Sequence, residues 1–297
     1  MRRIISDAAT PTPGAVGAPT ITALMPVKDY HERYLRTSID SLLRQTSSEW
    51  RLLIVGEREN QDELQAFLKR DLRDPRIELM PSEGRFLAGA LNTGMRHART
   101  RFVAILLGDD VWSPDAVAVL SENIRRHPEV DFFHSSRMVI DEKDRPLSSV
   151  YPSSEKVLLE NFPRASPVKH LLCWRKELAL SFGGMDESIP VAADDFDFPW
   201  TMAERGAVFR AVPECLYLYR DHRDFYRLTT HVPRNVRARH LRRIMRKHGV
   251  SRLEVSRRLL AARRSYLRQG VYRSRLDRWM KLRSGFDPHR GWRQPYR

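Results

Sequence analysis

The stretch VAILLGDDVWSPD, residues 103–115, decides the fold. Its first five residues form an unbroken apolar run, which predicts a strand buried on both faces of a sheet. The run ends in a glycine that is followed at once by two carboxylates, Asp109 and Asp110. Ser113 can cap the helix that follows, and Pro114 suits the first position of that helix. Two acids therefore lie at the carboxyl end of a buried strand, which is the edge where open α/β sheets bind ligands.

Two adjacent carboxylates at such an edge repel each other unless a cation joins them. Oxygen ligands of this kind suit Mg²⁺ or Mn²⁺, and either cation in turn suits a diphosphate. The alternative is that Asp109 and Asp110 are ordinary solvated turn residues, because aspartate favours turns. The rest of the chain must decide between a metal site and a simple turn.

The segments around this stretch alternate between strand and helix patterns. Apolar runs predict strands at residues 21–27, 51–55, 76–80 and 130–135, and amphipathic spacing predicts helices at 35–46, 61–72 and 86–98. Gly89 and Gly94 in the last of these helices indicate close approach, either of the helix to the sheet or of backbone to a ligand. The second half is less regular, with a helix that ends near Arg205 and short strands at 208–212 and 216–219. The alternation implies crossover connections and a mostly parallel central sheet flanked by helices.

The composition is that of a globular protein without a membrane span. Of 297 residues, 41% are hydrophobic and 30% are charged, which is a soluble globular profile. No segment approaches the roughly 18 apolar residues needed to cross a bilayer, and the amino end lacks the apolar stretch of a signal peptide. Cys173 and Cys215 show neither metal-site spacing nor a disulfide framework, so a reducing cytoplasm is the expected compartment.

The net charge of +15 is concentrated at one end of the chain. Residues 232–297 contain 21 Lys and Arg against 3 Asp and Glu, which leaves 31 basic and 34 acidic residues for the rest of the chain. We therefore divide the chain into a disordered leader at 1–19, a near-neutral domain at 20–231 and a basic helical tail at 232–297.

The pattern of the tail predicts three short amphipathic helices. Leu241, Ile244 and Met245 form the first apolar stripe, and residues 251–254, SRLE, form a capping box that opens the second helix. Basic amphipathic helices suit an anionic membrane surface, at about 1 kcal/mol per basic residue near the headgroups. Peripheral binding to the inner face of the cell membrane is therefore one expectation. Three alternatives stay open: the stripes dock on the protein's own sheet, the arginines bind nucleic acid nonspecifically, or the tail forms a homodimer contact.

Six motifs follow one another along the first two thirds of the chain. They are MPV at 25–27, SIDSLLRQT at 38–46, ALNTG at 90–94, LGDDVWSPD at 107–115, FGGMD at 182–186 and the pair Asp194-Asp195. No single motif is specific, but together and in this order they are. The chain resembles the family 2 glycosyltransferases, which are inverting enzymes of the GT-A fold that use nucleotide-sugar donors.

The resemblance implies a role for each acidic motif. Asp109 holds a divalent metal, Mn²⁺ or Mg²⁺, under the donor diphosphate, and Asp110 orients the donor sugar or the waters of the metal. Asp195, beside Asp194, is the general base, which requires it to converge with Asp109 on a shared cleft. His222 is a further metal ligand or a diphosphate contact. The other residues implied to bind the donor are Pro26, Val27, Glu57 and Asn92.

Some of these residues can also be explained by structural roles alone, without catalysis or ligand binding. Taken alone, Asp194 and Asp195 suit a helix start, where acids favour the amino end. His222 suits a packed histidine, and Asn92 suits a bond to the local backbone.

Two positions depart from the family pattern. The family usually has aspartate where Leu107 stands, and it ends the second strand in Asp-Asp-Gly-Ser where this chain has Gly56-Glu57-Arg58. Glu57 replaces the acid that contacts the nucleotide with one of longer reach. UDP-sugars are therefore the first expectation, and guanosine and thymidine diphosphate sugars stay open.

Sugar transfer has two chemical requirements, and each acidic cluster can meet one of them. Displacing a nucleoside diphosphate builds negative charge on the leaving phosphate, which a bound cation stabilises, and the attacking hydroxyl must lose its proton to a positioned carboxylate. We therefore expect a GT-A-type α/β enzyme of polysaccharide biosynthesis that transfers a sugar to a hydroxyl of a glycan or lipid-linked acceptor. One alternative is a non-catalytic binding protein on a degenerate GT-A scaffold, suggested by Leu107. The other is a basic nucleic-acid-binding protein, which leaves both acidic clusters unexplained.

Overall fold

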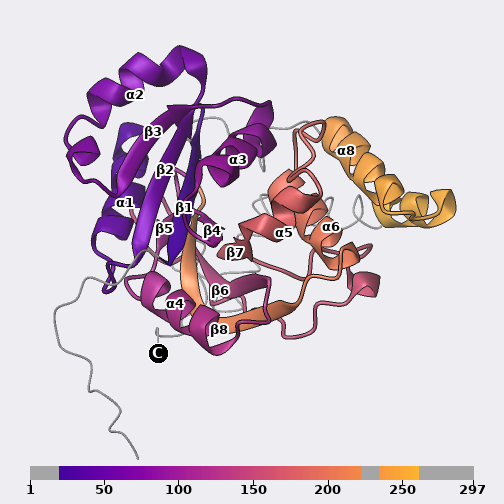
Figure 1. Ribbon diagram of the computed structural model, residues 1–297. Coiled ribbons are helices and arrows are strands. Elements are labelled where there is room, and N and C mark those ends of the chain that lie inside the picture. The colour runs from indigo at the N-terminus through magenta and orange to yellow at the C-terminus, as the bar shows by residue number, and fades with distance from the viewer. Residues whose placement is uncertain (1–19, 223–233, 261–297) are drawn as a thin grey trace, which may run out of the picture.

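The computed structural model describes residues 20–222 and 234–260 (Figure 1). The predicted leader, and the tail beyond residue 260, lie outside the described residues. The described chain forms one eight-stranded sheet in the order β3-β2-β1-β4-β7-β6-β8-β5. The predicted α/β architecture with a mostly parallel, helix-flanked sheet is confirmed.

The first half of the chain builds the parallel part of the sheet. Its strands are β1 (Ile21–Val27), β2 (Trp50–Gly56), β3 (Ile77–Pro81) and β4 (Phe102–Ile105). The helices between them are α1 (Glu32–Leu43), α2 (Gln61–Phe67) and α3 (Phe86–His97). The helix predicted at 61–72 is shorter than expected, because after α2 the chain continues into a separate 3₁₀ turn, Asp71–Arg73. This parallel arrangement brings the carboxyl ends of the strands to one edge of the sheet.

Antiparallel strands enter the sheet in the second half. β6 (Phe132–Ile140) runs parallel to β8 (Phe209–Arg220), β7 (Leu172–Arg175) lies antiparallel between β4 and β6, and β5 (Val111–Trp112) runs antiparallel to β8. β5 and β7 have two and four residues, which is too short for a periodic signal. The two short strands predicted at 208–212 and 216–219 are one strand, whose register against β6 shifts at Ser135–Arg137.

α4 (Ala116–Arg126) begins two residues later than predicted. Its N-cap residue is Asp115, and the cap predicted at Ser113 is wrong. The backbone N–H of Ser113 donates to the Leu216 carbonyl at 2.9 Å, so the chain is still extended beside β8 at this point.

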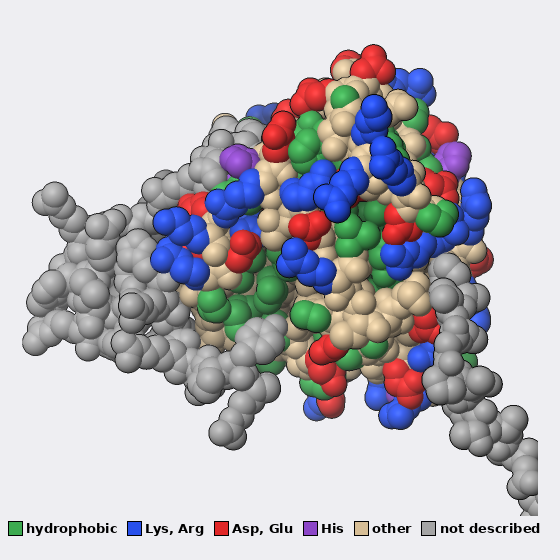
Figure 2. Space-filling view, turned by 90° about the vertical axis from the view of Figure 1, so that its left-hand side faces the viewer, with side chains coloured by type: hydrophobic (Ala, Val, Ile, Leu, Met, Phe, Trp, Pro, Cys, Tyr) green, Lys and Arg blue, Asp and Glu red, His purple; other side chains and the backbone are tan. Residues whose placement is uncertain are grey.

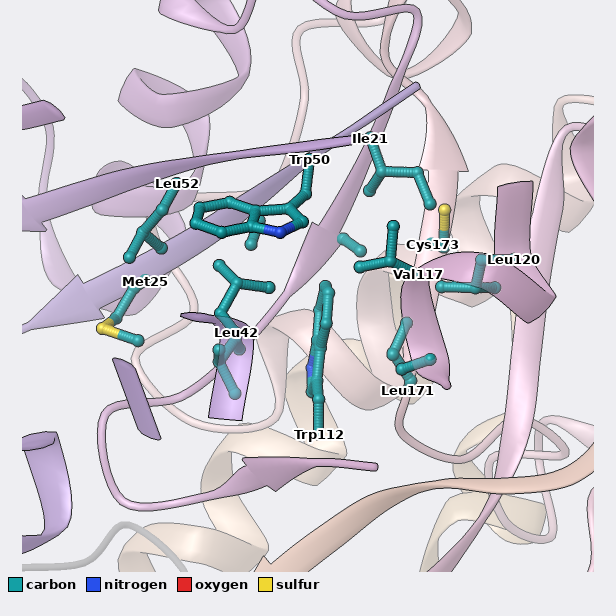
Figure 3. Close-up of a cluster of buried hydrophobic side chains, with 14 of the residues drawn as sticks. Ile21, Met25, Leu42, Trp50, Leu52, Trp112, Val117, Leu120, Leu171 and Cys173 are labelled. Atoms are coloured by element: carbon teal, nitrogen blue, oxygen red, sulfur yellow. The ribbon is translucent and has the colours of Figure 1, made fainter. Parts of the chain in front are cut away.

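Two apolar clusters fill the space on the two faces of the sheet. The first packs α1 and α4 against the sheet and includes Trp50, Trp112 and Cys173 (Figure 3). The second covers the other face with α3, α5 (Lys176–Ser181) and α6 (Phe198–Glu204). Rigid packing on both faces fixes the sheet edge that carries the acidic residues.

Both glycines of α3 allow close packing. A Cβ atom at Gly94 would lie 2.8 Å from Leu24 Cδ2 of β1, and one at Gly89 would overlap the backbone of Gly84. The predicted close approach of helix to sheet is therefore confirmed at Gly94. At Gly89 the close neighbour is the backbone of Gly84, which was not among the predicted alternatives.

The first helix of the predicted tail, α8 (Arg234–Lys247), docks on the body of the protein. Ile244 and Met245 are buried in the second apolar cluster. Ser251 then accepts a hydrogen bond from the backbone N–H of Glu254 at 3.2 Å, which is one of the two bonds of the predicted capping box, and the Glu254 carboxylate pairs with Arg258 at 2.6 Å. The apolar stripe thus packs on the protein itself, which is one of the alternatives that the sequence left open.

Among the described residues, none of the helices combines the length and the apolar character that a bilayer crossing requires. On the face shown in Figure 2, Lys and Arg side chains are interspersed with Asp and Glu. This mixture agrees with the near-neutral charge balance counted for the domain.

Candidate active site

A cavity of about 560 Å³ opens at the carboxyl ends of β1 and β2. Three predicted donor-binding residues, Pro26, Val27 and Glu57, line it together. Phe86 and Leu87 from the first turn of α3 add apolar surface. The size of the cavity and its mixture of apolar walls with a few polar groups suit a small organic ligand.

The turn after β2 places Glu57 in this lining. The Gln61 side chain at the start of α2 donates to the carbonyls of Gly56 and Glu57 at 3.1 and 3.2 Å. A Cβ atom at Gly56 would lie 2.9 Å from Gln61 Nε2, so glycine lets the chain turn this closely. An acid therefore stands in the cavity wall despite the departure from the family pattern.

Asp109 faces His222, the second residue after β8. Asp109 Oδ2 and His222 Nε2 lie 3.1 Å apart, the Asp109 side chain is 21% exposed, and the His222 ring is buried. This separation is that of a hydrogen bond or ion pair. It also equals the spacing of about 3 Å that two ligands at right angles around Mg²⁺ or Mn²⁺ would have with bonds of about 2.1 Å. Within residues 20–222 and 234–260, no three His, Cys, Asp or Glu side chains form a metal cluster. A cation here would therefore complete its shell with water and phosphate oxygens, as Mg²⁺ commonly does.

Asp110 is fully buried and bonded within the protein. Its carboxylate accepts hydrogen bonds from the Tyr217 hydroxyl at 2.6 Å and from the backbone N–H of Arg220 at 2.7 Å. Burial, together with the charges of Asp110 and Asp109, raises the pKa of Tyr217 well above its usual value. Asp110 does not line the cavity. Instead of the predicted donor contact, it fixes the end of β8 from which His222 extends.

Asn92 is also held inside the protein. Its side-chain amide donates to the Met185 carbonyl at 2.9 Å and to Glu187 at 2.9 Å, and its oxygen accepts from the Met185 N–H at 2.8 Å. Asn92 is buried and does not line the cavity. The donor contact predicted for Asn92 therefore needs correction, because its polar groups already anchor the FGGMD loop at 182–186 to α3.

Asp194 and Asp195 lie in a π-helical turn, Ala193–Asp197, that leads into α6. Turns of this kind often mark functional sites. Burial and then the charge of Asp195 raise the pKa of Asp194 to about 8. Burial also raises the pKa of Asp195, whereas the charges of Arg137 and Arg237 act to lower it. Burial of both carboxyl groups and their proximity therefore disfavour two negative charges in this turn.

Two side chains connect this turn with the edge that carries Asp109 and Asp110. His170 Nε2 lies 3.7 Å from Asp194 Oδ2, and the His170 ring packs against Tyr217 with ring centroids 5.1 Å apart. The Tyr217 hydroxyl in turn bonds Asp110. Burial lowers the pKa of His170 to about 3, so its ring is neutral. A series of side-chain contacts thus connects Asp194 with Asp110. Neither Asp109 nor Asp195 lines the cavity at the ends of β1 and β2, so their predicted convergence on a shared cleft stays a prediction.

Sequence reasoning missed Arg137, His170 and Tyr217. Arg137 on β6 packs over the ring of Tyr219 on β8, 5.3 Å from guanidinium carbon to ring centroid. No motif marks these residues, because their partners lie far away along the sequence.

The α/β fold, with its mostly parallel, helix-flanked sheet and an acidic turn after β4, is that of a glycosyltransferase of the GT-A type. The family model described as glycosyl transferase family 2 matches residues 22–173, just over half of the chain. The protein belongs to this family and is therefore an enzyme. Family membership sets aside the alternative of a nucleic-acid-binding protein.

Two relatives illustrate the range of similarity. The chain is 25% identical over 218 residues to an uncharacterised glycosyltransferase of Methanocaldococcus jannaschii, covering 72% of this chain and 75% of the archaeal protein. It is 37% identical over 82 residues to the Escherichia coli enzyme WfgD, named UDP-Glc:alpha-D-GlcNAc-diphosphoundecaprenol beta-1,3-glucosyltransferase. That match covers 27% of this chain and 32% of WfgD.

Solved structures share the fold. S. aureus TarS 1-349 in complex with UDP-GlcNAc superposes with a TM-score of 0.58 at 16% identity, covering 88% of this chain and 75% of that chain. The mannosyltransferase PcManGT from Pyrobaculum calidifontis, in complex with GDP-Man and Mn²⁺, gives 0.55 at 17% identity, covering 92% and 81%.

Proposed function

We propose that this glycosyltransferase transfers a sugar from a nucleotide-sugar donor, with UDP-sugars as first candidates, to a hydroxyl of a glycan or lipid-linked acceptor. We propose that the transfer inverts the anomeric centre and depends on Mn²⁺ or Mg²⁺. The observation that carries the proposal is the Asp109–His222 pair, in the segments that follow β4 and β8, together with the cavity lined by Pro26, Val27 and Glu57 at the ends of β1 and β2. The nucleotide sugars bound in the TarS and PcManGT complexes support a donor of this class.

The cavity and the Asp109–His222 pair suit different parts of such a donor. Apolar walls with one acid suit the nucleoside, and Glu57 can accept hydrogen bonds from it. Asp109 and His222 would hold the cation, which when bound stabilises negative charge on the leaving diphosphate as a Lewis acid.

Asp195 is the general base that activates the acceptor hydroxyl. Its carboxylate takes the proton of the acceptor hydroxyl, the hydroxyl oxygen bonds to the anomeric carbon, and the bond from that carbon to the diphosphate oxygen breaks with its electron pair. Attack on the face opposite the leaving group inverts the centre. Burial and the charge of Asp195 raise the pKa of Asp194 beside the base, which disfavours two charges in the turn at once.

The test measures release of nucleoside diphosphate from UDP- and GDP-sugars in the presence of Mn²⁺. Asp195→Asn should lower turnover by about 10²- to 10⁴-fold, the usual contribution of a general base. Asp109→Ala should abolish the activity, and added Mn²⁺ should not restore it. Wild-type turnover in both variants would refute the assignment of the site.

We also retain peripheral binding to an anionic membrane, in the cytoplasm, as a proposal for the tail. Arg239, Arg242 and Arg246 are exposed along α8, and Leu253 beyond it is 63% exposed. Because Ile244 and Met245 pack on the body, attraction by charge rather than insertion of α8 would draw the protein to the surface. Equal sedimentation with neutral and anionic vesicles would rule this out.

A further inference from the structure

One wall of the cavity comes from a helix outside residues 22–173, the part that matches the family model. Val236 and His240 of α8 line the cavity together with Pro190 and Val191. The segment that the sequence assigns to a basic tail therefore contributes to the proposed donor site.

The face that α8 turns inward is continuous. At 100° per residue, Val236, His240 and Ile244 follow one another along a single stripe of the helix. Val236 and His240 line the cavity, and Ile244 is buried in the core. Arg242 and Arg246 lie on the opposite side of the helix and are exposed. The position of His240 is thus set by the same packing that docks the helix.

Charged contacts fix the far end of α8. Lys247 Nζ lies 2.8 Å from Asp197 Oδ2 and 3.1 Å from Asp186 Oδ2. His248 Nε2 lies 3.1 Å from Asp197 Oδ1, and the His248 ring stacks on Trp200 with centroids 4.2 Å apart. Asp197 belongs to the π-turn that carries the proposed base, so one helix of about 16 Å between Val236 and Lys247 connects that turn with the cavity.

We propose that α8 forms part of the donor site and that His240 is a specificity-determining residue that contacts the nucleoside of the donor. The inference rests on the proposed function. A neutral imidazole has one hydrogen-bond donor and one acceptor, and a nucleoside offers matching groups on its base edge and ribose hydroxyls. Burial, and then the charges of Arg239 and Arg243, lower the pKa of His240, which keeps the ring neutral at pH 7. Val236 supplies apolar surface beside it.

The test compares His240→Ala with Arg242→Ala, which alters the exposed face of the same helix. Binding of UDP and of GDP is measured by calorimetry with Mn²⁺ present, and donor KM and kcat are measured separately. We expect His240→Ala to weaken binding of the cognate nucleotide about tenfold, or 1.4 kcal/mol, and to raise donor KM with kcat little changed. His240→Asn, which keeps a donor and an acceptor, should restore part of the affinity, and Arg242→Ala should match wild type.

A second variant, Val236→Phe, narrows the cavity without removing a polar group and should also weaken nucleotide binding. If wild type binds nucleotide and both cavity variants bind it as tightly as Arg242→Ala, the inference about α8 is wrong while the proposed function stands. If wild type binds neither nucleotide, the proposed function fails and the inference fails with it.

Discussion

Asp109 and Asp110 are neighbours in sequence, and the structure predicts opposite consequences when each is replaced. Asp110→Ala removes the acceptor for two buried donors, the Tyr217 hydroxyl and the Arg220 N–H. An unsatisfied buried donor costs about 1–3 kcal/mol, so the variant should lose about 2–6 kcal/mol of unfolding free energy. Asp109→Asn keeps the shape of a partly exposed side chain and should change stability by less than about 0.5 kcal/mol. Its turnover should nevertheless fall about a hundredfold or more, because the proposed cation loses a charged ligand.

Urea unfolding followed by tryptophan fluorescence gives the stability of each variant, and nucleoside diphosphate release gives the activity. Asp62→Ala, at an exposed position of α2, is the control and should match wild type in both measurements. Equal stability of the Asp110→Ala variant and wild type would refute the assignment of Asp110 to the scaffold. A loss of stability in Asp109→Asn as large as that in Asp110→Ala would show that the two residues share one structural role.

Three further predictions follow from the same geometry. Arg137→Met should move the acidic limb of the kcat profile to higher pH, because the lost positive charge no longer lowers the pKa of Asp195, whereas Arg137→Lys should move it less. Gly183 and Gly184 both have positive φ, so replacing either with alanine should cost about 1 kcal/mol or more of stability from backbone strain. Gly184→Ala should lower the thermal unfolding temperature further than Gly183→Ala, because only a Cβ at Gly184 meets Asn92. Chelation of divalent cations should abolish donor turnover, and added Mn²⁺ should restore it; turnover that persists in chelator would contradict the metal requirement.

The parallel half of the fold could be predicted because its segments carry strong local signals. β1 begins and ends at the predicted residues, and the buried run at Val103–Ile105 lies in β4. β5 and β7 could not be predicted, since strands of two and four residues owe their conformation to partners elsewhere in the chain. The extra two residues before α4 have the same cause, because pairing with β8 holds Ser113 extended.

The candidate site divides in a similar way. The family resemblance implied that Pro26, Val27 and Glu57 bind the donor, and the structure places all three in the lining of one cavity. It also implied a metal role for Asp109 and His222, whose side chains lie 3.1 Å apart. The same motifs could not separate residues that face a ligand from residues that hold the frame. Asp110 and Asn92 belong to the frame because of hydrogen bonds to positions about 90 to 110 residues away, and such partners carry no local signal.

The two cysteines differ in their exposure to solvent, which allows selective chemical labelling. Cys173 is enclosed in the first apolar cluster, where burial raises the pKa of its thiol, so alkylating reagents will not modify it in the folded protein. Cys215 on β8 is only half-buried. A maleimide dye should therefore attach at Cys215 alone, seven positions before His222, and report ligand-dependent changes near that strand without any engineered thiol.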